Sequence, residues 1–307
     1  MKKGIILITV LLLSVCQTNA QSMQNPDNAV QLSDDFDQSQ GRVTFYADNR
    51  DFCDYYLNIT FIYSEGFTGM PRGTSLSVSN GNRQILNYRV QEGASHYRYN
   101  YNYTMYRGNA NMQPNVDFAY CLPVANEDNV DAKITENRYG YQLELEMSTD
   151  TIYACRGGII CNDKLKDNSA KGHKTFQDNF KFSQITVYHA DGSFGEYIFQ
   201  GKALLYPGQT VKMGSPIATV AKNTIDESVL RFSTYYLDKN KLKDNNNGNK
   251  HTHFRPFFQT YNYGKARLES GKNYISEHTE EMFMQDMSKR EKKAALKSKG
   301  KQTDEEK

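Results

Sequence analysis

The sequence has no tryptophan and almost no net charge, since 37 Lys and Arg residues stand against 35 Asp and Glu residues in a chain of 307. This balance argues against a nucleic-acid-binding protein, which normally carries a basic excess. No segment of the mature chain has 18 consecutive apolar residues, so no integral membrane span is expected. Apolar residue types make up 38% of the chain, with 22 Tyr and 16 Phe among them. Because Tyr and Phe favour strands, the composition predicts a folded protein rich in β structure.

The first twenty residues have the pattern of a secretory signal peptide. The basic pair Lys2-Lys3 precedes an apolar run from Ile5 to Val15, and small residues follow before residue 21. An alternative is a lipoprotein acylated at Cys16, which the bulky Val15 before it disfavours. We therefore expect export to the periplasm or cell envelope, and removal of Lys2 and Lys3 leaves a mature chain without net charge.

Four cysteines remain after the signal peptide: Cys53, Cys121, Cys155 and Cys161. An even number of cysteines in an exported chain indicates disulfides, with three possible connectivities. Cys155 and Cys161 flank a glycine turn signal inside an apolar run, so a Cys155–Cys161 bond across a hairpin is expected. A Cys53–Cys121 bond would then close the N-terminal domain. The alternative is a zinc–thiolate site, but neither pair has the C-x-x-C spacing typical of one.

Short alternating runs between turn signals divide the chain and predict an all-β fold. The expected order is a signal peptide (1–20), a polar leader (21–40), a β-sandwich (41–125), a second strand-rich domain (132–276), and a charged helix with a disordered tail (277–307). In the alternating segment 96–103 the tyrosines share one face. We interpret this segment as a half-buried edge strand and not as a stacking surface for sugars or bases.

Three segments of the second domain carry a resemblance to a known family. They span residues 151–160, 185–199 and 205–217, and we interpret them as a tight hairpin, a hairpin turning at Asp191-Gly192, and a strand pair with glycine turns. In order and spacing they resemble the lysostaphin/LytM-type zinc endopeptidases, which hydrolyse peptidoglycan. The resemblance implies a lysostaphin-like (duplicated hybrid motif) antiparallel β domain after the sandwich. The charge pattern of the segment after residue 277 separately predicts a short C-terminal helix.

The same resemblance locates the family's zinc and catalytic positions. They fall on five residues that are not usual zinc ligands or proton carriers: Tyr139, Leu143, Phe199, Val229 and Arg231. A one-residue slip would place Glu144 near the family's aspartate. The resemblance therefore implies a degenerate, non-catalytic member with no cofactor.

Such a protein would bind peptidoglycan or a cell-envelope protein through the former substrate groove. We expect Arg231, Tyr197 and His189 to contribute, with Arg231 replacing the positive charge of the metal. His189 matches a family position that supports the hairpin.

Two further functions stay open. An active zinc-dependent peptidoglycan endopeptidase would use His251 and His253, spaced to share a strand face, with a third ligand such as His173. A structural component of an envelope complex would use the tyrosine-rich segment and the charged tail as docking surfaces. Metal content together with peptidoglycan hydrolysis separates these functions.

Overall fold

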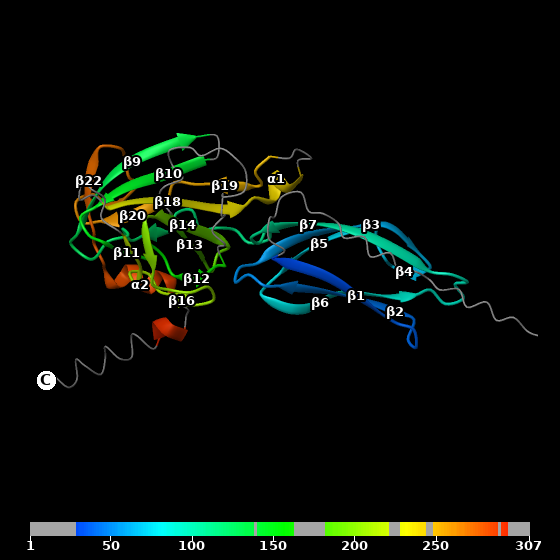
Figure 1. Ribbon diagram of the computed structural model, residues 1–307. Helices are drawn as coiled ribbons and strands as arrows, with labels where there is room; N and C mark the ends of the chain where they lie inside the picture. The colour runs from blue at the N-terminus through cyan, green and yellow to red at the C-terminus, as the bar shows by residue number, and fades with distance from the viewer. Residues whose placement is uncertain are drawn as a thin grey trace, which may run out of the picture.

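The computed structural model describes residues 29–137, 140–162, 182–220, 228–243, 248–287 and 290–293. The predicted signal peptide with Cys16, as well as Tyr139 and His173, lie outside these residues. The described chain forms two β-rich lobes placed side by side (Figure 1), so the predicted all-β class is confirmed. None of the helices within the described ranges is both long and apolar enough to cross a membrane.

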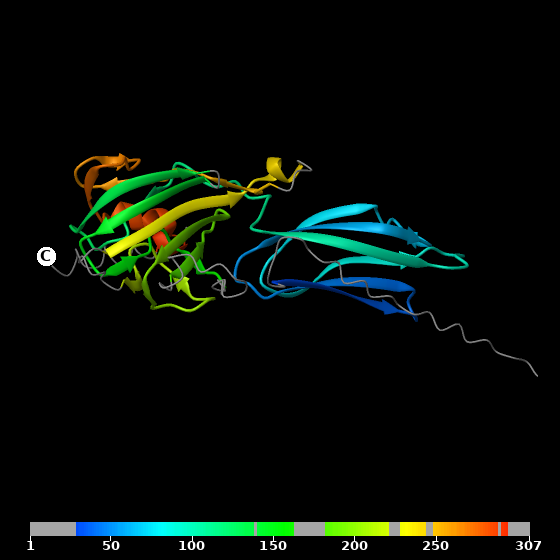
Figure 2. The ribbon, with the colours of Figure 1, turned by 45° about the horizontal axis from the view of Figure 1, so that its top comes forward.

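The N-terminal lobe is a sandwich of two antiparallel sheets, whose layers are separated in Figure 2. One sheet has the order β1-β2-β6-β4 and the other has the order β5-β3-β7. The strands are β1 (Val30–Asp37), β2 (Arg42–Asn49), β3 (Tyr55–Glu65), β4 (Phe67–Thr68), β5 (Gly73–Val78), β6 (Gly81–Val90) and β7 (Arg98–Arg107).

Strand β1 occupies residues that the sequence predicts as part of a polar leader. It pairs with β2 along its whole length. Val30 is fully buried, and Leu32 and Phe36 pack against the sandwich core. The prediction is wrong for these residues, because apolar side chains two and four positions apart suffice to bury one face of a strand in an otherwise polar segment.

Three tyrosines of the alternating segment, Tyr99, Tyr101 and Tyr103, pack against the core of the sandwich. The rings of Tyr99 and Tyr101 on β7 form T-shaped contacts with Phe45 on β2, with centroid distances of 5.8 and 5.2 Å. Both hydroxyls donate hydrogen bonds to the carboxylate of Asp34. Burial, together with this carboxylate, raises the pKa of both hydroxyls. The interpretation of this segment as a half-buried strand is therefore confirmed.

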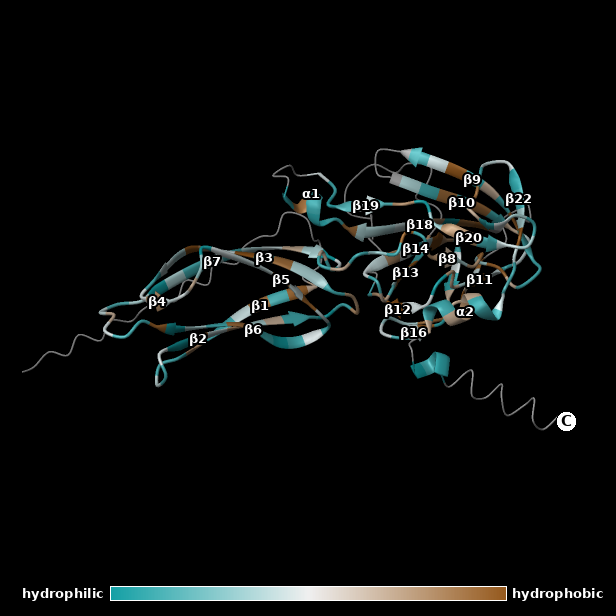
Figure 3. Ribbon diagram, turned by 180° about the vertical axis from the view of Figure 1, so that it is seen from behind, coloured by the Kyte–Doolittle hydropathy of each residue, from teal (hydrophilic) through white to brown (hydrophobic). Residues whose placement is uncertain are grey.

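The C-terminal lobe is built on a nine-stranded sheet with the order β16-β12-β13-β14-β18-β10-β9-β22, in which β19 also pairs with β18. Two three-stranded sheets, β11-β17-β15 and β21-β20-β8, pack beside it. Figure 3 shows hydrophobic and hydrophilic residues alternating along β9 and β10, as expected for strands with one buried face.

The strands of this lobe are β8 (Ala119–Tyr120), β9 (Asn129–Asn137), β10 (Gly140–Met147), β11 (Thr151–Tyr153), β12 (Gly158–Ile160), β13 (Ser183–Tyr188), β14 (Ser193–Phe199), β15 (Gly201–Ala203), β16 (Thr210–Val211), β17 (Pro216–Val220), β18 (Ser228–Leu237), β19 (His251–His253), β20 (Phe257–Thr260), β21 (Gly264–Ala266) and β22 (Lys272–Ile275). The helices are α1 (Lys239–Lys243) and α2 (Glu280–Asp286).

The boundary between the lobes lies earlier than the sequence predicts. The sandwich ends with β7, whereas Phe118 and the apolar residues up to Val124 belong to the core of the C-terminal lobe. Strand β8 pairs in parallel with β20, which comes much later in the chain. The predicted limit at residue 125 is therefore too late, because a long-range pairing draws this segment into the second lobe.

One of the two predicted hairpins forms and the other does not. Strands β13 and β14 pair and turn at Asp191-Gly192, where Gly192 has a φ of 84° that favours glycine. In contrast, β11 pairs with β17, while β12 pairs with β13 and β16 in the nine-stranded sheet. The predicted hairpin over 151–160 is wrong, because the chain changes sheet at this turn.

The change of sheet also overturns the predicted disulfides. All four cysteines are free thiols in the structure. Cys121 and Cys155 lie in the core of the C-terminal lobe, whereas Cys53 and Cys161 belong to the core that includes the N-terminal sandwich. Each predicted bond, Cys155–Cys161 and Cys53–Cys121, therefore joins residues of different cores, and both pairings are wrong.

Helix α2 agrees with the helix predicted after residue 277. The Thr279 side chain accepts a hydrogen bond from the Met282 backbone N–H (3.3 Å), which caps the first turn. Met282 is buried in the core of the C-terminal lobe and Phe283 packs against it. The helix is thereby fixed to the second lobe.

Candidate functional site

The predicted zinc and catalytic positions do not come together on one face of the sheet. Leu143 pairs with Phe232, and Phe199 pairs with Leu230, so both side chains point into the core, where each is 0% exposed. Val229 and Arg231 are the alternate residues of β18, so they point to the opposite face. The four described positions are thus divided between two faces, and a single metal ion cannot contact all of them.

The outer face of the sheet carries a row of charged side chains around Arg231, which we call the Arg231 face. The row runs across three strands, with Lys133 paired to Glu144 and Glu144 paired to Arg231. The Nε atom of Arg231 is 3.7 Å from Glu144 Oε2, and Lys133 Nζ is 3.7 Å from Glu144 Oε1. The guanidinium also lies 5.5 Å from the centroid of the Phe182 ring. A one-residue slip would place Glu144 near the family's aspartate position. In the structure its carboxylate instead pairs with two cations, Lys133 and Arg231.

The other two predicted binding residues are inside the protein. Tyr197 is 0% exposed, and its hydroxyl accepts a hydrogen bond from the Cys155 backbone N–H (2.8 Å). His189 is 1% exposed, and its Nδ1 is 2.8 Å from the Gly157 carbonyl oxygen. Burial and the neighbouring Arg156 lower the pKa of His189 to about 3, so the imidazole is neutral and Nδ1–H donates. Both side chains support the turn at residues 155–157 and offer no surface to a ligand.

A buried charge cluster that no sequence pattern predicted lies at this turn. Arg156 Nη1 is 2.8 Å from Asp191 Oδ2, and its Nε is 3.4 Å from Asp286 Oδ1. Asp286 Oδ2 also accepts from the Gly157 N–H at 2.6 Å, which ties α2 to the turn. Although burial opposes its ionisation, the Arg156 charge holds the pKa of Asp191 at about 2, whereas burial raises the pKa of Asp286. Arg156, Asp191 and Asp286 are far apart in sequence. Of the three, the sequence marked only Asp191, through its Asp-Gly turn signal.

His251 and His253 share one face of β19, as the alternative zinc site requires. Both rings lie 5.3 Å from the Tyr235 ring centroid. His251 Nε2 is 2.8 Å from the Arg107 carbonyl oxygen, and burial lowers the pKa of His251 to about 4. Over the described ranges, no third His, Cys, Asp or Glu joins this pair in a cluster of potential ligand atoms. The pair lies at the junction of the lobes, because His251 contacts the Arg107 carbonyl oxygen at the end of β7.

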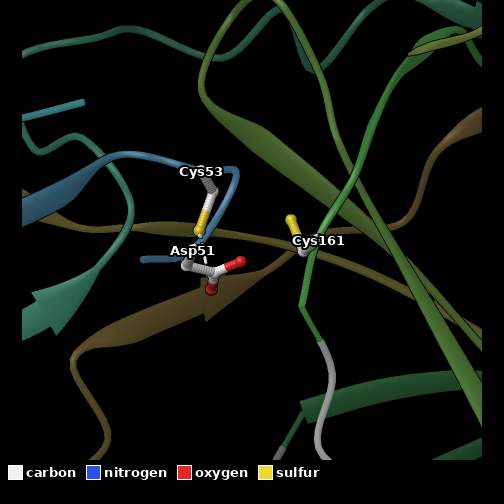
Figure 4. Close-up of side chains that lie close together, drawn as sticks. All are labelled: Asp51, Cys53 and Cys161. Atoms are coloured by element: carbon white, nitrogen blue, oxygen red, sulfur yellow. Dashed lines mark hydrogen bonds between the residues drawn. The ribbon is translucent and has the colours of Figure 1, made fainter. Parts of the chain in front are cut away.

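The described residues do contain one cluster with the composition of a metal site. Atoms of Asp51, Cys53 and Cys161 lie within 4.8 Å of one another, and all three residues are buried (Figure 4). Asp51 and Cys53 follow β2, whereas Cys161 follows β12 of the other lobe. No sequence spacing signals this cluster, because the two lobes must dock before its members meet.

Comparisons with known proteins assign no family to this chain. No protein-family model matches the chain, and no curated protein matches it. A solved structure described as a novel M23 metalloprotease, pseudoalterin, from deep-sea, aligns with 52% of this chain and 96% of its own length, at 14% identity and a TM-score of 0.29. The described fold is all-β. Likeness at this level assigns neither a family nor an activity to the chain.

Proposed function

We propose that the chain is an exported, non-catalytic protein that binds a carboxylate-bearing peptide of peptidoglycan, or of a cell-envelope partner, on the Arg231 face. The observation that carries this proposal is the position of Arg231 on the outer face of the large sheet, with its side chain 41% exposed. The export signal expected from residues 1–20 supports a location where such a peptide is met.

The surroundings of Arg231 suit a ligand with a carboxylate. The 3.7 Å separation between its Nε and Glu144 is longer than a hydrogen bond, so this ion pair is weak. A planar guanidinium can bind a carboxylate through two parallel hydrogen bonds. The Phe182 ring beside it, 37% exposed, adds apolar surface for the rest of a bound peptide.

The interior of the sheet supports a role without hydrolysis. A zinc hydrolase of the resembled type needs ligands and proton carriers around an open metal position. At two of the corresponding positions this chain has Leu143 and Phe199, both packed in the core of the C-terminal lobe. These side chains contribute to stability by burying apolar area and have no group that binds a metal or moves a proton.

The central test of the proposal is the variant Arg231→Ala. Loss of a charge-assisted hydrogen bond pair should weaken binding to purified peptidoglycan or to soluble stem peptides by about 10- to 100-fold. Cosedimentation and calorimetry measure the effect. Arg50→Ala is the matched control, since Arg50 is also an exposed arginine paired with a carboxylate, in the other lobe. Unchanged binding by Arg231→Ala would reject the Arg231 face.

Metal content distinguishes this function from the alternative hydrolase. The proposal expects purified protein to bind peptidoglycan without releasing soluble peptides, whether or not zinc is added. Stoichiometric zinc that is lost in His253→Ala, together with peptide release, would show instead that the histidine pair forms a working site.

A further inference from the structure

The Asp51–Cys53–Cys161 cluster lies where the two lobes meet. The Asn162 N–H donates to Asp51 Oδ1 at 2.7 Å, directly beside Cys161. Nearby, the Tyr188 hydroxyl donates to Asp54 Oδ2 at 3.2 Å. These bonds join the loop between β2 and β3 to the end of β13 and to the segment that follows β12 in the C-terminal lobe, so the relative position of Cys53 and Cys161 is fixed by docking of the lobes.

The two thiols are close and shielded from water. Their Sγ atoms lie within 4.8 Å of each other, and Cys53 and Cys161 are each 1% exposed. Figure 4 shows the two sulfur atoms facing the space between the segments that carry them. A disulfide requires the sulfur atoms to approach to about 2.05 Å, which side-chain rotation can supply when the backbones are already adjacent.

A metal ion fits this cluster poorly. A structural zinc site needs four ligands, whereas only three are present among the described residues. Both oxygens of Asp51 are already used: Oδ1 accepts from backbone N–H groups, and Oδ2 accepts from the Tyr55 hydroxyl and from Arg107. The Arg107 Nη2 atom is 3.1 Å from Asp51 Oδ2, and its Nε contacts Cys53 Sγ at 3.4 Å. A fixed guanidinium at this place already neutralises the carboxylate and would repel a cation.

We propose that Cys53 and Cys161 form a disulfide that links the two lobes covalently. The proposal relies on the export included in the proposed function, because disulfides persist in oxidising compartments. The oxidant is a disulfide of an oxidoreductase or of a small thiol. A cysteine thiolate attacks it to form a mixed disulfide and releases one donor thiol. The second cysteine thiolate then displaces the other donor thiol, so two protons leave the protein and the donor is reduced by two electrons.

The bond must form before or during docking of the lobes. Burial raises the pKa of Cys53 well above its ordinary value, so the docked thiol is protonated and unreactive. Early in folding both residues are exposed, and docking then brings them together. Once formed, the bond keeps the Asp51 loop against Cys161 and Asn162, and it is protected from reduction by its burial.

Peptide mapping of the full mature chain tests the proposal. The protein is refolded with reduced and oxidised glutathione, blocked with an alkylating agent, digested without reductant and analysed by mass spectrometry. The expected result is a linked peptide pair containing Cys53 and Cys161, which is lighter than the separate peptides by two hydrogen atoms and disappears on reduction. The double variant Cys121→Ala/Cys155→Ala is the matched control and should retain the link.

Three results would overturn the proposal. The first is recovery of Cys53 and Cys161 as alkylated thiols from natively folded protein. The second is a linkage of either cysteine to Cys121 or Cys155. The third is stoichiometric zinc in the reduced protein that is lost in Cys53→Ala. The disulfide is tested by oxidation of purified protein, and peptide binding is tested separately with Arg231→Ala. Failure of either test therefore does not decide the other proposal.

Discussion

Replacing Arg156 by alanine should lower the free energy of unfolding by about 3–5 kcal/mol, the cost expected when one partner of a buried ion pair is removed. The side chain of Arg156 is 6% exposed and lies between Asp191 and Asp286. Its removal leaves two buried carboxylates without their counter-charge. It also removes the guanidinium from the face of the Phe118 ring, 3.9 Å from the centroid.

Urea unfolding checks this prediction, followed by circular dichroism and tyrosine fluorescence because the chain has no tryptophan. Arg231→Ala is the matched control: Arg231 also pairs with a carboxylate, but its side chain is 41% exposed and the loss should be below about 1 kcal/mol. If Arg156→Ala does not fold, Arg156→Lys and Asp286→Asn provide milder tests. Equal losses for Arg156→Ala and Arg231→Ala would contradict the prediction.

The sequence predicted elements whose signals are local. The Asp191-Gly192 turn and its flanking alternation define a hairpin within a few residues, and β13 and β14 form as expected. The charged segment after residue 277, with Glu280 and Glu281 near its start, likewise predicts a helix, and α2 begins at Glu280. In both cases the residues that determine the structure are neighbours in the chain, so tertiary context does not change the outcome.

The candidate site was less predictable, because it depends on strand register and on contacts between distant segments. The family resemblance placed Phe199 and Arg231 in one site, yet alternation along paired strands puts them on opposite faces. The turn at residues 156–158 resembles a hairpin turn, but the flanking strands enter different sheets. For the same reason the close thiols are Cys53 and Cys161, which no spacing rule would pair.

Lowering the pH from 7 to 5 should destabilise the fold by about 2 kcal/mol for each of two buried histidines. The pKa of His189 is lowered to about 3 by burial and by Arg156, and the pKa of His251 is lowered to about 4 mainly by burial. In the unfolded chain both titrate near pH 6.5. As the pH falls, protons therefore bind the unfolded state first. The stability that each neutral imidazole contributes is present above pH 6.5 and is lost as the pH falls toward the pKa of the folded state, about 4 for His251 and about 3 for His189.

The histidines can be separated from other acid effects by substitution. His251→Gln keeps a donor near the position of Nε2, and His189→Asn keeps one near Nδ1, so each variant preserves the hydrogen bond without the titration. Each should reduce the difference in free energy of unfolding between pH 7 and pH 5 by about 2 kcal/mol. His96→Gln is the control, since the His96 side chain is 74% exposed.

The Asp191 carboxylate, which lies near His189, does not account for this window. Asp191 has a pKa held at about 2, below its ordinary value of 3.8, so its contribution is present above pH 3.8 and is lost only as the pH falls toward 2. A loss of stability between pH 6.5 and 5 that persists unchanged in both His251→Gln and His189→Asn would contradict the assignment. A loss that falls by about half in each variant would show that the turn at Gly157 and the junction at Arg107 both depend on neutral imidazoles.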